Sequence, residues 1–311
     1  MEIGLGFFDY EKVLDNEIQD FIKKCETFNQ GSSSEQPIAE SRLAYDAMCA
    51  SFNSGRPRSV IVKDLWQNKL NIRRYSTQLS AGKSVLFIHG GGHALGGLDS
   101  HDDICADISF LTNSTVYALD YRLGPEHKHP SAYNDCLSCL KYVEKKENTK
   151  VLLVGDSAGG NLVAAIADSD QVNQKNLIGQ ILIYPSLGNL DSFGTPVIHD
   201  NAPLLSFKDV ESMYNNYFKS TLCLNDKRAR PIISNTLGRL PKTFVFSAEF
   251  DPLYDDGKKY CDLVNEQGGD ATFFKSTGLI HMHLRARHRS TKAKTEFIKI
   301  VKVINKLFEH Y

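Results

Sequence analysis

Short apolar runs alternate with helical patterns along most of this chain, and this alternation constrains the fold more than any other feature. The apolar runs that indicate buried strands lie at 85–89, 116–121, 151–154, 178–184 and 243–246. The helical patterns lie at 102–111, 133–145, 161–168, 208–218 and 254–266. Such alternation is typical of an α/β fold with a mostly parallel sheet and helices on both faces. A further strand is expected toward the sheet edge at 271–275, and a hairpin at 59–65 and 70–75.

The composition and net charge of the chain argue against nucleic acids and membranes as partners. The chain has 311 residues, a net charge of −1 and 41% hydrophobic residues. These values predict a globular protein without the basic surface that nucleic acids or anionic membranes require. The N-terminus is acidic where a signal peptide needs a basic start, and the apolar runs are too short to span a membrane. We therefore expect a cytoplasmic protein, as a monomer or homo-oligomer.

One close cysteine pair needs an interpretation. Cys136 and Cys139 lie at helical spacing with Leu140 and Val143, so we expect them in a helix core. Zinc-finger spacing is missing from the sequence, and neither a metal nor a cofactor is predicted.

Two segments interrupt the alternation. Residues 1–55 are mostly helical and contain the polar stretch 30–37, which predicts a flexible loop. Residues 186–235 are long and mixed, and they follow an expected strand. Long inserts at the carboxyl ends of strands often cover binding sites. We expect both segments to form a cap, and residues 56–185 and 236–311 to form the core domain.

The run Gly155-Asp156-Ser157-Ala158-Gly159 follows a strand and precedes a helix. This is the context of the G-x-S-x-G nucleophile elbow, in which a strained turn lifts a serine clear of the sheet. Small residues are needed because the turn brings its flanks very close together. The motif predicts that Ser157 is a nucleophile and that the helix N-terminus faces the site.

A second glycine-rich motif, His89-Gly90-Gly91-Gly92, directly follows the strand at 85–89. Backbone N–H groups aimed at a developing oxyanion stabilise acyl transfer, and a glycine run lets the backbone approach that oxygen closely. In HGGG-containing lipases and esterases the N–H after the nucleophile assists. We expect the oxyanion donors to be Gly90, Gly91 and Ala158.

Several motifs together carry a family resemblance. HGGG, DYRLGPEHKHP (120–130), GDSAGG, AEFDPLYDDG (248–257) and GLIHMH (278–283) occur in this order. The chain resembles the hormone-sensitive-lipase-like family of α/β-hydrolase esterases, and GGLDSHDDI and AEFDPL are most similar to bacterial acetyl esterases. The resemblance implies an eight-stranded sheet flanked by helices, a helical cap, and metal-free hydrolysis of short-chain acyl esters.

The remaining triad members should follow later strands, in the order Ser, acid, His. Four acidic residues follow the strand at 243–246, and the resemblance selects Asp251, with Glu249 as the alternative. The base is expected in a loop after the strand at 271–275. His281 matches the family's G-x-x-H, and His283 is its competitor.

Other motif residues are expected to act outside the triad. Asp156 and Glu126 are expected to hydrogen-bond loops around the site. His93 replaces the family's usual aromatic residue, either tuning the pocket or serving as an aromatic substitute without chemistry. The sequence therefore predicts a serine carboxylesterase acting on small esters. The alternatives are a lipase, an amidase, lactonase or peptidase with the same triad, and a non-catalytic binding member of the fold.

Overall fold

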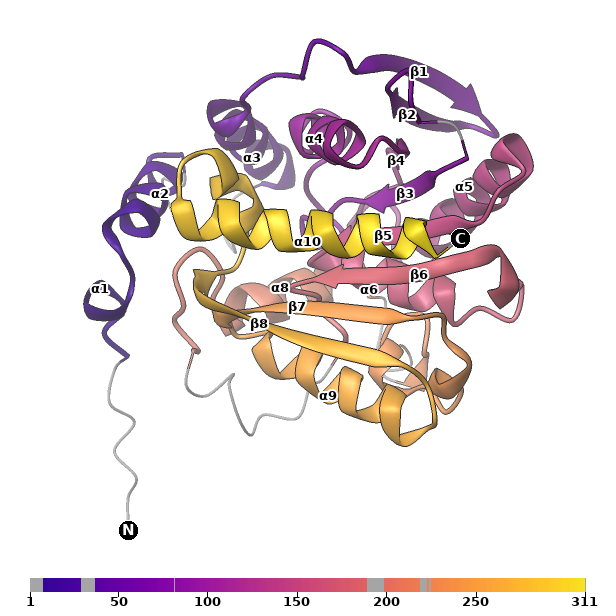
Figure 1. The fold of residues 1–311 in the computed structure, drawn as a ribbon. Helices are drawn as coiled ribbons and strands as arrows, with labels where there is room; N and C mark the ends of the chain where they lie inside the picture. Colours follow the sequence, from indigo (N-terminus) through magenta and orange to yellow (C-terminus); the bar gives the residue numbers. More distant parts are fainter. Residues whose placement is uncertain are drawn as a thin grey trace.

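An eight-stranded sheet forms the centre of the molecule (Figure 1). The computed structural model describes residues 8–28, 37–80, 82–188, 199–218, 223 and 225–310. The strand order is β1-β2-β4-β3-β5-β6-β7-β8. Strands β3 to β8 are mutually parallel, and β2 pairs antiparallel with both β1 and β4. The strands are β1 (Ile61–Gln67), β2 (Leu70–Ser76), β3 (Ser84–Ile88), β4 (Thr115–Leu119), β5 (Val151–Asp156), β6 (Leu177–Ile183), β7 (Thr243–Phe250) and β8 (Ala271–Ile280).

The expected hairpin is present at one edge of the sheet. Its two-residue turn, Asn68-Lys69, has positive φ at both positions, 51° and 66°. That conformation matches the twist of the flanking strands. The hairpin register pairs Gln67 with Leu70 and Ile61 with Ser76.

Helices cover both faces of the sheet and form two apolar cores (Figure 1). Side chains of α5 (Ser131–Glu147), α6 (Ala158–Ala167) and α9 (Tyr254–Glu266) pack in one core. Side chains of α4 (Asp102–Thr112) and α10 (Thr291–Glu309) pack in the other. Cys136 and Cys139 are fully buried in the first core, where the helical spacing placed them.

The remaining helices of the described residues lie near the carboxyl ends of the strands. They are α1 (Tyr10–Val13), α2 (Asn16–Glu26), α3 (Ile38–Phe52) and α8 (Phe207–Tyr217). Helices α2 and α3 pack against the last residues of β7 and β8, at the left of Figure 1. Residues 30–36 of the predicted flexible loop, and residues 189–198, lie outside the described residues. The division into cap segments 1–55 and 186–235 and a core domain stays a prediction.

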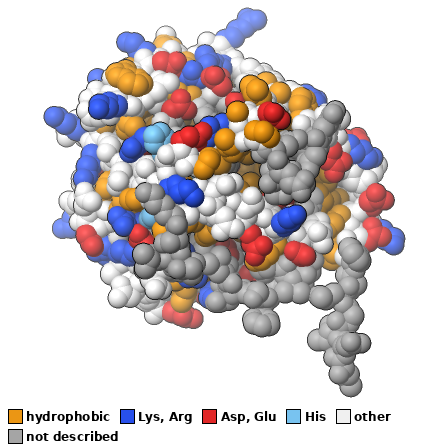
Figure 2. Space-filling view, turned by 180° about the vertical axis from the view of Figure 1, so that it is seen from behind, with side chains coloured by type: hydrophobic (Ala, Val, Ile, Leu, Met, Phe, Trp, Pro, Cys, Tyr) orange, Lys and Arg blue, Asp and Glu red, His pale blue; other side chains and the backbone are white. Residues whose placement is uncertain are grey.

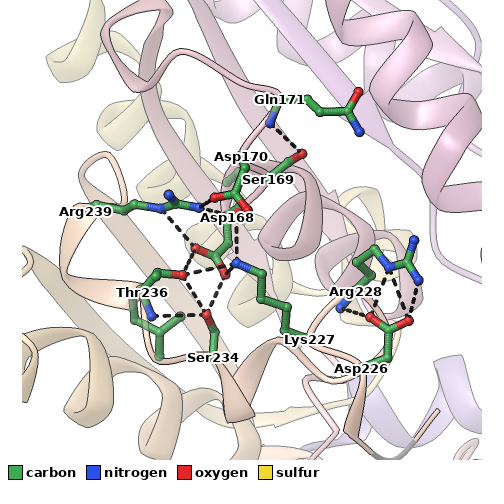
Figure 3. Close-up of polar contacts among 12 residues, drawn as sticks. Asp168, Ser169, Asp170, Gln171, Asp226, Lys227, Arg228, Ser234, Thr236 and Arg239 are labelled. Carbon is green, nitrogen blue, oxygen red and sulfur yellow. Dashed lines mark hydrogen bonds and ion pairs between the residues drawn. The ribbon is translucent and has the colours of Figure 1, made fainter. Parts of the chain in front are cut away.

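A polar network fixes part of the second predicted cap segment at the far end of α6 (Figure 3). The buried carboxylate of Asp168 accepts hydrogen bonds from Ser234 Oγ at 2.5 Å and Thr236 Oγ1 at 2.7 Å. Lys227 Nζ lies 3.0 Å from the same carboxylate. Arg239 donates to the Asp168 carbonyl at 2.7 Å. These contacts hold residues 227–239 against the core, away from the serine at the opposite end of α6.

Several elements differ from their predicted bounds. β8 runs to Ile280 rather than ending at 275, so the expected loop before His281 is mostly strand. α6 begins at Ala158 rather than 161, directly after the serine. The sequence interpretation missed α10, although its buried Phe297, Ile300, Val301, Ile304, Leu307 and Phe308 have helical spacing.

Four short 3₁₀ turns complete the described elements: η1 (Gln174–Asn176), η3 (Pro231–Ile233), η4 (Leu237–Arg239) and η5 (His283–His288). Positive and negative side chains are interspersed over the face shown in Figure 2. None of the helices in the described part of the chain is long and apolar enough to cross a membrane.

Candidate active site

Ser157 lies on a strained turn between β5 and α6. Its φ of 53° and ψ of −121° are unusual for a residue with a side chain. The turn is tight enough to exclude side chains at both flanking glycines. A Cβ on Gly159 would lie 2.0 Å from the Ile88 carbonyl oxygen, and one on Gly155 would lie 2.5 Å from the Gly159 carbonyl oxygen.

The structure brings Ser157, His281 and Asp251 together although they are far apart in the sequence. His281 Nε2 lies 2.9 Å from Ser157 Oγ, and His281 Nδ1 lies 2.7 Å from Asp251 Oδ2. Each residue follows the carboxyl end of a parallel strand, namely β5, β7 or β8. The three strand ends meet at one edge of the sheet, which is where ligand sites of such sheets occur.

The acid is buried and held in place. Asp251 is 0% exposed, and its Oδ1 accepts the backbone N–H of Leu253 at 2.9 Å. The alternative, Glu249, is engaged elsewhere. It accepts the Gly278 N–H at 2.7 Å and pairs with Lys275 Nζ at 2.7 Å. The geometry therefore favours Asp251 as the partner of His281.

One predicted oxyanion donor needs correction. The Gly90 N–H donates to Asp156 Oδ1 at 2.9 Å, so it does not point at the reacting oxygen. No hydrogen bond within the described residues engages the N–H groups of Gly91 and Gly92, and both residues line a cavity at Ser157. Ala158 opens α6, where the first N–H groups have no intrahelical acceptor. The candidate donors are therefore Gly91, Gly92 and Ala158.

Asp156 fastens the glycine loop to the elbow. Besides the bond from Gly90, its carboxylate lies 3.4 Å from His101 Nε2 and accepts the Tyr184 hydroxyl at 3.4 Å. Burial alone would raise the pKa of Asp156. Its interactions with His101 and Arg285 and the hydrogen bond from Gly90 outweigh burial and lower that pKa to about 2.

The first histidine of the glycine motif has a structural role. His89 Nδ1 lies 2.8 Å from the Gly90 carbonyl oxygen, and the ring stacks on Tyr121 with centroids 4.2 Å apart. Burial lowers the pKa of His89 to about 3, with a smaller effect from His101. A neutral ring in this position shapes the loop without carrying charge.

The two histidines with open roles are also buried. His93 stacks on Tyr217 with ring centroids 4.2 Å apart, as an aromatic substitute would, and burial lowers its pKa to about 3. His283 packs against Tyr184, and its Nδ1 lies 3.1 Å from the Ile280 carbonyl oxygen. Burial lowers the pKa of His283 to about 4. In this geometry His281, and not His283, bonds the serine.

Among the described residues, Ser157 lies in the wall of a larger and of a smaller cavity. The larger is about 470 Å³, and His281, Asp156, Met48, Leu95, Ile104 and Arg285 are among its lining residues. The smaller is about 20 Å³ and is lined by Gly92, His93, Ser157, Ala158, Ser186, Leu205, Val210, Met213, Tyr214 and Leu253. His281 lines the larger cavity and is absent from the lining of the smaller one.

The sequence interpretation missed a contact between Arg42 of α3 and the loops beside the site. Arg42 bonds both carboxylate oxygens of Glu126, at 2.8 and 2.7 Å, and donates to the carbonyl oxygens of Ala94 and Gly124. Glu126 thus holds a loop beside the site, as expected. Arg42 itself lies outside the resembling motifs, and no local signal marks its contact.

The fold and these motifs define the class of protein: the chain belongs to the α/β-hydrolase fold family, whose model matches residues 85–285. Carboxylesterase NlhH of Mycobacterium tuberculosis is 31% identical over 210 residues, which cover 63% of this chain and 65% of that protein. The acetyl esterase of Salmonella paratyphi B is 29% identical, over 71% of each chain.

A solved carboxylesterase structure is also similar to this chain in fold. EstE1, a thermophilic carboxylesterase from a metagenomic library, superposes with a TM-score of 0.82 at 26% identity, over 89% of this chain and 99% of that chain. These matches confirm the resemblance to hormone-sensitive-lipase-like esterases and the α/β-hydrolase fold.

Proposed function

We propose that this protein is a serine carboxylesterase that hydrolyses esters with a short acyl group. The observation that carries the proposal is the continuous hydrogen-bonded relay from Ser157 through His281 to Asp251. The relatives named as carboxylesterase and acetyl esterase support the same reaction class.

In the proposed mechanism, Ser157 Oγ attacks the ester carbonyl while His281 Nε2 takes its proton. Asp251 holds the imidazole in the required tautomer and stabilises the imidazolium that forms. The N–H groups of Gly91, Gly92 and Ala158 stabilise the tetrahedral oxyanion, each contributing on the order of 3 kcal/mol. His281 then protonates the leaving alcohol, and later activates water to release the acid.

The two cavities support the acyl-chain assignment. The leaving alcohol receives its proton from His281, so it should depart on the side that His281 lines, which is the 470 Å³ cavity. The acyl group then faces the cavity of about 20 Å³ beside Ala158. That volume accommodates about one water-sized group, such as the methyl group of an acetyl ester. The geometry favours a small acyl group joined to a larger alcohol.

The test is hydrolysis of p-nitrophenyl acetate, hexanoate and dodecanoate by the wild type and Ser157→Ala. We expect acetate to be hydrolysed fastest, and Ser157→Ala to lower kcat by roughly 10⁴-fold or more. Ser138→Ala, an exposed serine on α5, is the matched control and should keep wild-type activity.

Each alternative has its own result. Fastest hydrolysis of dodecanoate would indicate a lipase-like pocket. Absence of hydrolysis, together with a Ser157 that resists a fluorophosphonate probe, would indicate a fold kept for binding and would refute the esterase proposal.

A further inference from the structure

A buried arginine that the triad does not use lines the larger cavity. Arg285 is 5% exposed and lies four residues after His281, on η5. Its Nη1 donates to the Ser100 carbonyl oxygen at 2.6 Å, and its Nη2 contacts Tyr45 Oη at 2.9 Å and His101 Nε2 at 3.2 Å. None of these three contacts is to a carboxylate.

A neighbouring arginine shows what a structural buried arginine looks like in this fold. Arg287 is 2% exposed, and its Nη2 lies 2.6 Å from Asp103 Oδ2 and 2.8 Å from Asp107 Oδ2. Buried charges in proteins are normally paired in this way. Arg285, in contrast, forms no ion pair with a carboxylate of the described residues.

The guanidinium of Arg285 also has N–H donors that no hydrogen bond of the described residues uses. Of its five N–H groups, the three contacts above use one on Nη1 and two on Nη2. Within the described residues, no hydrogen bond engages the Nε–H group of Arg285. A guanidinium with free donors at the wall of a cavity suits a carboxylate ligand, whose oxygens match its planar geometry.

The other charged residues of the cavity neither form an ion pair with Arg285 nor offer a second buried cation for a carboxylate ligand. Asp156 interacts with Arg285 electrostatically but forms no ion pair with it, because its carboxylate accepts from Gly90 and Tyr184 and His101 Nε2 lies 3.4 Å from that carboxylate and 3.2 Å from Arg285 Nη2. Glu26 and Lys208 are exposed, and the Asp209 carboxylate accepts from Ser206 at the start of α8. Exposed charges are screened by salt far more than a buried one.

We propose that Arg285 binds a carboxylate on the leaving alcohol, so that the preferred substrates are short-acyl esters of hydroxy acids or phenolic acids. This inference rests on the proposed esterase function, because it assigns the alcohol to the larger cavity. Met48, Leu95 and Ile104 provide apolar walls for the body of that alcohol. Tyr45 and His101 hold the guanidinium in position.

The experiment compares 4-acetoxyphenylacetate with 4-acetoxyphenylacetamide. The two esters share acyl group and phenol, and a methylene insulates the reacting oxygen from the group that differs. We expect kcat/KM of the wild type to favour the carboxylate ester roughly 10- to 100-fold, the range of a charge-assisted hydrogen bond. Arg285→Gln should abolish this ratio, and Lys208→Gln, which removes a cation at the cavity mouth, should keep it.

The outcomes separate this inference from the esterase proposal. Hydrolysis of both esters at equal kcat/KM by the wild type overturns the role of Arg285 and leaves the esterase proposal intact. If Lys208→Gln loses the preference for the carboxylate ester and Arg285→Gln keeps it, the preference comes from charge at the cavity mouth, and the inference is overturned. An equal fall of both rates in Arg285→Gln, with the ratio retained, shows a purely structural arginine.

Binding provides a readout that needs neither turnover nor a folded arginine variant. Calorimetry with the wild type should show 4-hydroxyphenylacetate binding at least about tenfold more tightly than 4-hydroxyphenylacetamide. Equal affinities for the two phenols refute the inference about Arg285, whether or not the esters are hydrolysed. Absence of ester hydrolysis is a separate result, and it would refute the esterase proposal. Circular dichroism establishes whether Arg285→Gln is folded before its ratio is interpreted.

Discussion

Replacing Val210 by alanine should let the enzyme accept a longer acyl group. Val210 is buried on α8 in a cluster with Leu205 and Leu253, and it lines only the smaller cavity. That cavity is about 20 Å³, and the substitution removes two methyl groups from its wall. The new space is comparable to the two methylenes by which a butanoyl group exceeds an acetyl group. Each buried methylene contributes about 0.8 kcal/mol, so the butanoate-to-acetate ratio should rise by roughly 15-fold.

The assay is kcat/KM for p-nitrophenyl acetate and butanoate. Leu204→Ala is the control, because Leu204 lines only the larger cavity and its truncation should leave the acyl ratio unchanged. Urea unfolding of Val210→Ala checks that the variant is folded, with an expected loss of about 1–2 kcal/mol. A ratio that stays constant in Val210→Ala, or rises equally in Leu204→Ala, would refute the assignment of the small cavity to the acyl group.

Two further predictions concern carboxylates around the site. Asp251→Asn should lower kcat by roughly 10⁴-fold, because the amide favours the wrong imidazole tautomer, whereas Glu249→Gln should change kcat only a few-fold; steady-state kinetics that reverse this order would exchange the two roles. Asp156, with its pKa lowered from 3.8 to about 2, should contribute about 2 kcal/mol of stability that is present above pH 4 and lost as the pH falls toward 2. Urea midpoints between pH 5 and 3 should fall less steeply in Asp156→Asn than in the wild type, and parallel curves would contradict this prediction.

Elements with strong local signals were predictable from the sequence. The buried strands and the helices between them follow from apolar runs and periodicity, which report burial directly. The elbow at Ser157 could be predicted because a turn that excludes side chains demands small residues at adjacent positions. The hairpin at β1 and β2 was also visible in the sequence. In contrast, the end of β8 was misplaced, since the polar stretch at 276–278 resembles a loop although β8 continues through it beside β7.

The sequence by itself determined the fold class, the nucleophile elbow and a short list of triad partners, because each depends on residues that are near one another in the chain. Only the tertiary structure decided that His281 rather than His283 bonds Ser157 and that the Gly90 N–H is committed to Asp156. The two unequal cavities, and an Arg285 that forms no direct ion pair among the described residues, likewise emerge only in three dimensions. Their walls come from α3, α8, the glycine loop and η5, which are widely separated in the chain and meet only when the strand ends converge. The relative placement of such segments is set by packing, which no local pattern encodes.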